Sequence, residues 1–220
     1  STRHDEVLGR DGFACGCLNP PNLCALIILG GADFGFKRDV FPEVERSETD
    51  DEVIAVAQVR CDDPHPADHM AKQLGPGPFE LVCLFVSPEA DFRAIVADTV
   101  NLFGSADVLA CTTAGEIGRS GYEDDQIIAV AFRKGPFKAL TYAIENLHAI
   151  EEQSVAGSLI EARLALAQKT PDWTSEFAFL MVDGLSLREE QLTAFLSAGL
   201  GPTPLFGGSS GDGTRFGQTW

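Results

Sequence analysis

The residues best suited to chemistry lie in two glycine-rich stretches that are far apart in the sequence. The first, Cys111 to Gln126, reads CTTAGEIGRSGYEDDQ, and the second, residues 207–213, reads GGSSGDG. Glycine lets the main chain approach a ligand closely, and exposed N–H groups in such loops hold carboxylates or phosphates. We therefore predict that the two stretches converge on one small polar ligand, and a pair of purely structural turns is the alternative interpretation.

In this hypothesis, main-chain N–H groups and side-chain hydroxyls bind a carboxylate, and an acidic residue binds an ammonium group. The hydroxyls would come from Thr112, Thr113, Ser209 and Ser210. The ammonium group would bind Glu116 or Asp183. The complete set of candidate ligand-binding residues is Cys111, Thr112, Thr113, Gly115, Glu116, Tyr122, Asp183, Gly207, Gly208, Ser209, Ser210 and Asp212.

Catalytic interpretations of the same residues are weaker. Residues 207–211 match the pattern G-x-S-x-G, but neither a helix pattern nor a histidine follows Ser209, as a nucleophile elbow requires. No lysine follows the glycines, which argues against a phosphate-binding P-loop. Cys111 would need a neighbouring base, and His148 is the one candidate. We therefore predict no enzymatic activity and rank a cysteine or serine hydrolase lowest.

A cluster of metal-ligand residue types surrounds His65 and His69, which are four positions apart. Cys61, Asp63 and Asp68 complete the cluster. Two histidines at this spacing share one face of a helix, as zinc ligands do, but the prolines on both sides of His65 place it outside a helix. Surface capping is the favoured interpretation, so we predict no metal site, and the six cysteines are expected to be reduced thiols.

Composition excludes several classes of protein. The 220 residues include 33 acidic and 16 basic side chains, which gives a formal net charge of −17, and 45% are hydrophobic. These fractions are typical of a globular protein. The negative charge argues against nucleic acid and against insertion into an anionic membrane. No apolar run is long enough to span a membrane, and no signal peptide is evident, so we expect a cytoplasmic protein.

Apolar runs and turn residues alternate along the chain from Val53 onward. The pattern predicts strands at 53–59, 79–86, 107–112, 126–132, 137–144 and 177–182, and helices at 66–74, from Ser87, at 151–168 and at 186–196. Lys134-Gly135-Pro136 predicts a hairpin between two of these strands. We expect a mixed α/β fold in layers, with helices packed on a mostly buried sheet, or on two sheets.

The first 52 residues differ from the rest. They end in an acidic stretch at 43–52 that is typical of a solvated linker, so residues 1–52 are expected to be an extension and 53–220 the domain. The final residues, 216–220, read FGQTW and resemble the start of a strand. We therefore expect the domain to continue beyond this sequence.

Four segments resemble the N-terminal part of FIST domains. They are FELVCLFVSPEADF at 79–92, ACTTAGEIGRSGYEDDQIIAVAF at 110–132, FLMVDGLSLREEQL at 179–192 and PLFGGSSGDGTRFGQT at 204–219. The resemblance implies an intracellular sensory module of a signal transduction protein that binds a small ligand, with amino acids proposed. It also implies a second, C-terminal FIST domain and an output partner such as a histidine kinase.

Two further functions remain as alternatives. One subgroup of FIST proteins is described as haem-binding nitric-oxide sensors, and an axial haem ligand could come here from Cys61, His65, His69 or His148. A pure interaction module, including a homo-oligomer formed through a sheet edge, is the other alternative. No cofactor is required by the favoured hypothesis.

Overall fold

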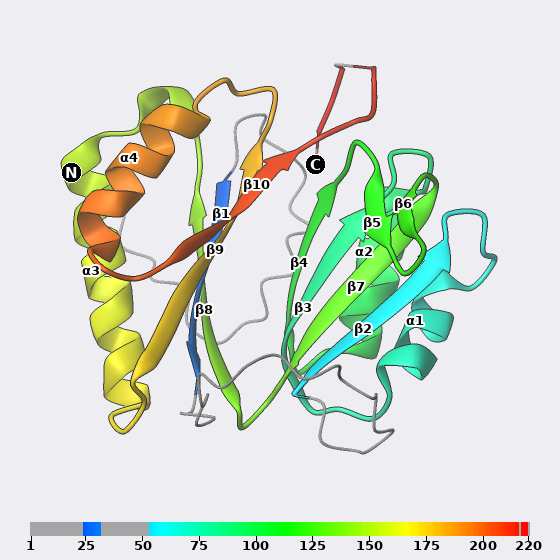
Figure 1. The fold of residues 1–220 in the computed structure, drawn as a ribbon, viewed down its shortest axis with the longest axis horizontal. Helices are drawn as coiled ribbons and strands as arrows, with labels where there is room; N and C mark the ends of the chain where they lie inside the picture. Colours follow the sequence, from blue (N-terminus) through cyan, green and yellow to red (C-terminus); the bar gives the residue numbers. More distant parts are fainter. Residues whose placement is uncertain (1–23, 32–52, 216, 220) are drawn as a thin grey trace.

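Two four-stranded sheets face each other, and helices cover the outer side of each (Figure 1). The computed structural model describes residues 24–31, 53–215 and 217–219. The mixed α/β fold predicted from the sequence, in its two-sheet form, is therefore confirmed. Among the described residues, no helix combines the length and hydrophobicity that crossing a membrane requires.

The first sheet has the strand order β2-β7-β3-β4. Its strands are β2 (Ile54–Arg60), β3 (Phe79–Val86), β4 (Asp107–Thr112) and β7 (Gln126–Arg133). Strands β3 and β4 are parallel, and the other pairs are antiparallel. Helices α1 (Pro66–Leu74) and α2 (Phe92–Leu102) cover its outer face. The continuous apolar run of β3 is explained by burial on both faces.

The second sheet has the strand order β10-β9-β1-β8. Its strands are β1 (Cys24–Gly31), β8 (Phe137–Ile144), β9 (Ser175–Asp183) and β10 (Leu205–Ser210). Helices α3 (Glu152–Lys169) and α4 (Glu189–Leu200) cover its outer face, and a short 3-10 turn, η1 (Leu147–Ala149), precedes α3. A small hairpin of β5 (Glu116–Gly118) and β6 (Gly121–Glu123) forms a separate two-stranded sheet.

Strand β1 lies inside the segment that was expected to be an extension. It pairs with β8 on one side and β9 on the other, both antiparallel. Its Leu26 and Ile28 pack against the helices, whereas Ile27 and Leu29 face the other sheet. The domain boundary near Val53 stays a prediction, but the second sheet has its central strand upstream of that point.

The predicted hairpin at Lys134-Gly135-Pro136 is wrong. Strands β7 and β8 belong to different sheets, because β2 and β3 already occupy both edges of β7. Among the described residues, the only pairing between the two sides of this turn is a single bridge between Lys134 and Phe137. The turn therefore carries the chain from one layer to the other. Residues 217–219 are likewise not in a strand, contrary to expectation.

Two helices begin later than the sequence predicts. Ser87 lies in a turn in which the Ala90 N–H donates to its carbonyl oxygen at 3.0 Å, and α2 begins after Asp91, whose carboxylate accepts from the Ala94 N–H at 3.1 Å. Ser186, where the other helix was expected to begin, lies outside α4. Its hydroxyl donates to the Asp183 carbonyl oxygen at 2.6 Å, in the turn that precedes α4.

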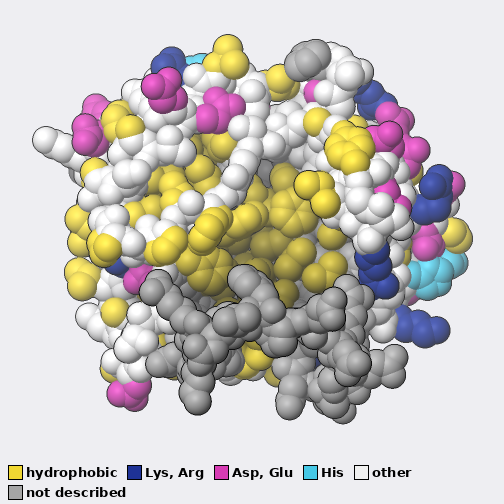
Figure 2. Space-filling view, viewed as in Figure 1, with side chains coloured by type: hydrophobic (Ala, Val, Ile, Leu, Met, Phe, Trp, Pro, Cys, Tyr) yellow, Lys and Arg dark blue, Asp and Glu magenta, His cyan; other side chains and the backbone are white. Residues whose placement is uncertain are grey.

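Hydrophobic side chains fill the space between each sheet and its helices and also the space between the two sheets. The rings of Phe85 and Phe179 meet edge to face across the sheets, with centroids 6.4 Å apart. Polar contacts join β8 to the first sheet, where the Lys138 ammonium lies 2.5 Å from the Glu80 carboxylate. Figure 2 shows that the viewed face is hollowed between the layers and lined there by hydrophobic side chains.

Candidate functional site

The two glycine-rich segments meet at the C-terminal ends of β4 and β10. The Gly211 N–H donates to the Thr112 carbonyl oxygen at 3.0 Å, and the Gly213 N–H donates to the Thr113 carbonyl oxygen at 3.3 Å. These two contacts bring together stretches almost 100 residues apart in the chain. In open α/β sheets, ligands bind at the carboxyl ends of strands, so the location suits a binding site.

Glycine at position 211 allows this close approach. A β-carbon built there would lie 2.8 Å from the Ala114 β-carbon and 3.1 Å from its main-chain nitrogen. Contacts between carbon atoms are most favourable at about 3.5–4.0 Å, so a side chain would push the segments apart. Gly207 serves β10 in a similar way, because a β-carbon there would collide with the Leu180 carbonyl oxygen. Residues 207–210 of the predicted loop are thus part of β10, and only residues 211–213 lie outside it.

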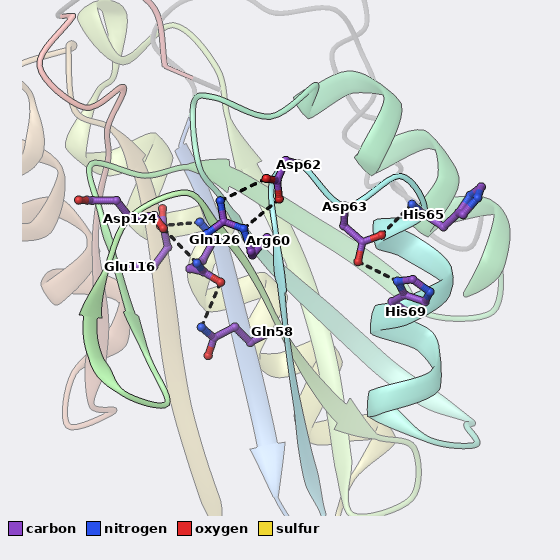
Figure 3. Close-up of polar contacts among 9 residues, drawn as sticks. All are labelled: Gln58, Arg60, Asp62, Asp63, His65, His69, Glu116, Asp124 and Gln126. Atoms are coloured by element: carbon purple, nitrogen blue, oxygen red, sulfur yellow. Dashed lines mark hydrogen bonds and ion pairs between the residues drawn. The ribbon is translucent and has the colours of Figure 1, made fainter.

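Glu116 holds the first loop in shape. Its buried carboxylate accepts from the Thr113 hydroxyl and, at 3.1 Å, from the Gln126 N–H. Figure 3 shows Glu116 beside Gln126, with Gln58 on the far side of Gln126. Both carboxylate oxygens are therefore engaged with the chain itself, which makes Glu116 a positioning residue for the loop.

The β5–β6 hairpin folds back over the same loop. The Tyr122 hydroxyl donates to the Ala114 carbonyl oxygen at 3.0 Å and lies where a side chain at Gly115 would be. Gln58 anchors the hairpin, since its amide donates to the Glu123 carboxylate at 2.7 Å and accepts from the Arg119 N–H at 2.9 Å. Sequence reasoning missed Gln58, because its role depends on the pairing of β2 with β7 and no motif marks it.

Asp183 and Asp212 bind residues close to the C-terminal end of the described chain. The Asp212 carboxylate accepts from the N–H groups of Gly217 at 2.6 Å and Gln218 at 2.9 Å. The Asp183 carboxylate accepts from the Thr219 hydroxyl at 2.5 Å and from the Leu185 N–H at 2.9 Å. Three consecutive residues thus bridge the two acids.

Several predicted side chains point away from the junction of the two segments. The Ser209 hydroxyl donates to the Glu189 carboxylate on α4 at 3.1 Å. Thr112 and Cys111 are adjacent in a strand and so face opposite sides of the sheet. Cys111 faces the other sheet, and burial raises the pKa of its thiol to about 12. A thiol with this pKa is almost entirely protonated at neutral pH, which argues against the nucleophile hypothesis.

The remaining donors at the junction are main-chain groups. Within the described part of the chain, no hydrogen bond engages the N–H groups of Ala114 and Gly115. Gly207 and Gly208 are exposed in β10, which is an edge strand of its sheet, and Ser210 is buried. The sequence pointed to Gly115 but not to Ala114, because alanine carries no chemical signature of its own.

The histidines lie elsewhere. His69 binds the Asp63 carboxylate through Nδ1 at 2.7 Å on the outer side of the first sheet, and Figure 3 shows His65 and His69 apart from Glu116. His148 accepts from the Arg188 guanidinium at 3.1 Å beside α4. Among residues 24–31, 53–215 and 217–219, no three histidine, cysteine or acidic side chains are grouped as metal ligands would be. Cys15 and Cys17 lie outside the described residues.

Comparison with known families gives one match. The family model described as the FIST N domain matches residues 80–220, which is well over half of the chain. No curated protein and no solved structure matches the chain. The matched range includes both glycine-rich segments, β9 with Asp183, and the residues that bridge Asp183 and Asp212.

Proposed function

The chain belongs to the FIST N domain family, whose members generally serve as sensory domains of signal transduction proteins, and we propose that it is an intracellular module that binds a small zwitterion such as an amino acid. The hydrogen bond from the Gly211 N–H to the Thr112 carbonyl oxygen carries the proposal. This bond places the two glycine-rich segments together at the ends of two strands.

The ligand's carboxylate would be held by main-chain donors. The N–H groups of Ala114 and Gly115 belong to a loop whose shape is fixed by Glu116 and Tyr122. Donors that are already oriented before binding lose little freedom when the ligand arrives. Because the net charge of the chain is −17, an anionic group needs such local donors to overcome the repulsion of the protein as a whole.

The ligand's ammonium group would bind Asp183. Of the two acids that the sequence offered for this role, Glu116 already accepts two hydrogen bonds from its own loop. Asp183 lies at the end of β9, and one of its donors is the Thr219 hydroxyl. A hydroxyl donor can give way to a charged ammonium group, because the ammonium group adds the attraction between opposite charges to the hydrogen bond with the carboxylate.

Thermal unfolding in the presence of each of the common amino acids tests the proposal. At a concentration of about 100 times Kd, a ligand adds about 2.7 kcal/mol to the free energy of unfolding, which raises Tm by about 5–10 °C for a chain of this size. Asp183→Asn keeps the acceptor oxygen but removes the charge, so it should weaken the amino-acid effect. Asp172→Asn, at an exposed turn, is the matched control and should change nothing.

A full set of amino acids that leaves Tm unchanged in the unaltered protein would refute the proposal. If an amino acid instead raises Tm equally in the unaltered protein and in Asp183→Asn, Asp183 takes no part in binding it.

The response would be passed on by protein contacts and not by a chemical reaction. FIST is a sensory family, and the raised pKa of the buried Cys111 thiol argues against a cysteine nucleophile in this region. We propose that a second, C-terminal FIST domain or a histidine kinase receives the signal. The domain that senses the ligand would be 53–220 together with β1, because β1 completes the second sheet.

A further inference from the structure

The residues that follow β10 form a strap across the candidate site. We define the strap as residues 211–215 and 217–219. Its beginning is attached to the end of β4 through the N–H groups of Gly211 and Gly213. In its middle, the Arg215 guanidinium pairs with the Glu89 carboxylate and donates to the Pro88 carbonyl oxygen at 3.4 Å, just before α2. Its last described residue, Thr219, binds Asp183 of β9.

The strap therefore joins the two sheets. Strand β4 and the turn before α2 belong to the layer of the first sheet, whereas Asp183 ends a strand of the second. The strap also folds on itself, because Asp212 near its start accepts from the N–H groups of Gly217 and Gln218 near its end. Asp212 and Thr219 are both buried, so these contacts are shielded from water.

The donors of the strap have the chemistry expected of a ligand's amine. Two N–H groups and one hydroxyl, on three consecutive residues, donate to the carboxylates of Asp212 and Asp183. A primary ammonium group also offers three donors and adds a positive charge. A ligand that carries one can thus replace the Thr219 hydroxyl on Asp183 at no loss of hydrogen bonding.

We propose that the strap is a built-in competitor of the ligand. A ligand with a primary ammonium group binds Asp183 by displacing Thr219, and this displacement releases the end of the strap from the second sheet. Binding and release are one event, so the strap converts occupancy of the site into a change in how the two layers are joined. This inference rests on the proposed function, and it narrows the ligand to amines that carry an anionic group.

The rate at which trypsin cuts after Arg215 measures the release of the strap directly. An arginine that is ion-paired and held in folded structure is cut more slowly than a released one. Thr219→Val removes the hydroxyl and keeps the shape of the side chain. Thr219→Ser keeps the hydroxyl. Thr193→Val on α4, whose hydroxyl donates to the Glu189 carbonyl oxygen at 2.8 Å, is a matched control away from the strap.

Without ligand, cleavage after Arg215 should be about tenfold faster in Thr219→Val than in the unaltered protein, because a hydrogen bond to a charged group contributes about that factor or more. Thr219→Ser and Thr193→Val should be cut at the original rate. Glycine should accelerate cleavage of the unaltered protein, and acetate, which lacks the amine, should not. Calorimetric titration should show that glycine binds Thr219→Val about tenfold more tightly.

Three results distinguish the strap from the function on which it rests. Equal cleavage rates for Thr219→Val and the unaltered protein overturn the strap, whether or not glycine binds, and so does glycine that binds but slows cleavage. If Thr219→Val is cut faster but no amino acid in the thermal screen binds, the proposed function and the competitor role both fail, and Thr219 serves only to fasten the strap to Asp183.

Discussion

A methyl group at position 211 should separate the two glycine-rich segments. The β-carbon of Gly211→Ala would lie 2.8 Å from the β-carbon of Ala114, 3.1 Å from its nitrogen and 3.3 Å from the Thr113 carbonyl carbon. Two of these atoms belong to the main chain and cannot rotate away. The substitution must therefore move the strap, and with it the hydrogen bond from residue 211 to the Thr112 carbonyl oxygen.

The magnitude follows from two contributions. Overpacking a well-packed site costs about 1–3 kcal/mol, and a lost hydrogen bond costs about 0.5–1.5 kcal/mol. The free energy of unfolding should fall by about 2–4 kcal/mol, which urea titration measures directly. At roughly 2–4 °C for each kcal/mol in a chain of this size, Tm should fall by about 4–16 °C.

Gly208→Ala is the matched control, because it adds the same methyl group in β10 three residues away. No atom lies within 4 Å of a β-carbon built at position 208. Its unfolding free energy should stay within about 0.5 kcal/mol of the original, as for other surface substitutions. The packing argument is refuted if the two alanine variants are equally stable. If Gly208→Ala is the less stable of the two, the placing of position 211 against Ala114 and of position 208 in open space is refuted.

The remaining predictions concern the framework that holds the site. Burial, reinforced by Glu80, raises the pKa of Asp107, so the charged carboxylate destabilises the fold at neutral pH. Asp107→Asn should raise Tm at pH 7. The gain should shrink as pH falls through the raised pKa and vanish below about 3.8, where the acid is protonated in both the folded and the unfolded chain. An increase in Tm that is independent of pH would contradict this. Arg163 donates to the Glu176 carboxylate at 2.5 Å and to the Thr203 hydroxyl at 2.8 Å. Arg163→Ala should therefore lower the free energy of unfolding, measured by urea titration, by about 1–3 kcal/mol. No measurable loss would show that this network does not stabilise the fold.

Local patterns predicted the elements whose boundaries are set by nearby residues. Helix α1 begins at Pro66 and ends before Gly75, and both residues mark helix ends in any context. The bounds predicted for strand β3 are the observed ones, because a short, nearly continuous apolar run between turn residues is typical of a strand buried on both sides. Strand β4 was likewise predicted at its observed bounds.

Errors arose where distant strands decide the outcome. The turn at Lys134-Gly135-Pro136 shows that the chain bends, but not that β2 and β3 already flank β7. Strand β1 was overlooked because the acidic stretch at 43–52 separates it from the rest of the domain. The glycines within residues 207–210 predict a loop because glycine has a low strand propensity, and pairing with β9 overrides that propensity.

For the site, residue types indicated the two segments but not the role of each side chain. Glycines at Gly211 and Gly213 pointed to a close approach, and the structure shows what they approach. The sequence could not separate Glu116 from Asp183, since both are acids after a strand. Their difference lies in the partners that the fold gives them: the Thr113 hydroxyl and the Gln126 N–H for Glu116, and the strap for Asp183.

The central claim is that main-chain amides at the junction of the two glycine-rich segments bind the ligand. Amide chemical shifts in a nitrogen-15 correlation spectrum, recorded while glycine is added, test it at the level of single residues. The N–H signals of Ala114 and Gly115 should shift in a saturable way, whereas the N–H of Gly157, on the far helix α3, should stay in place. Saturable shifts elsewhere in the chain, with Ala114 and Gly115 unmoved, would contradict the account.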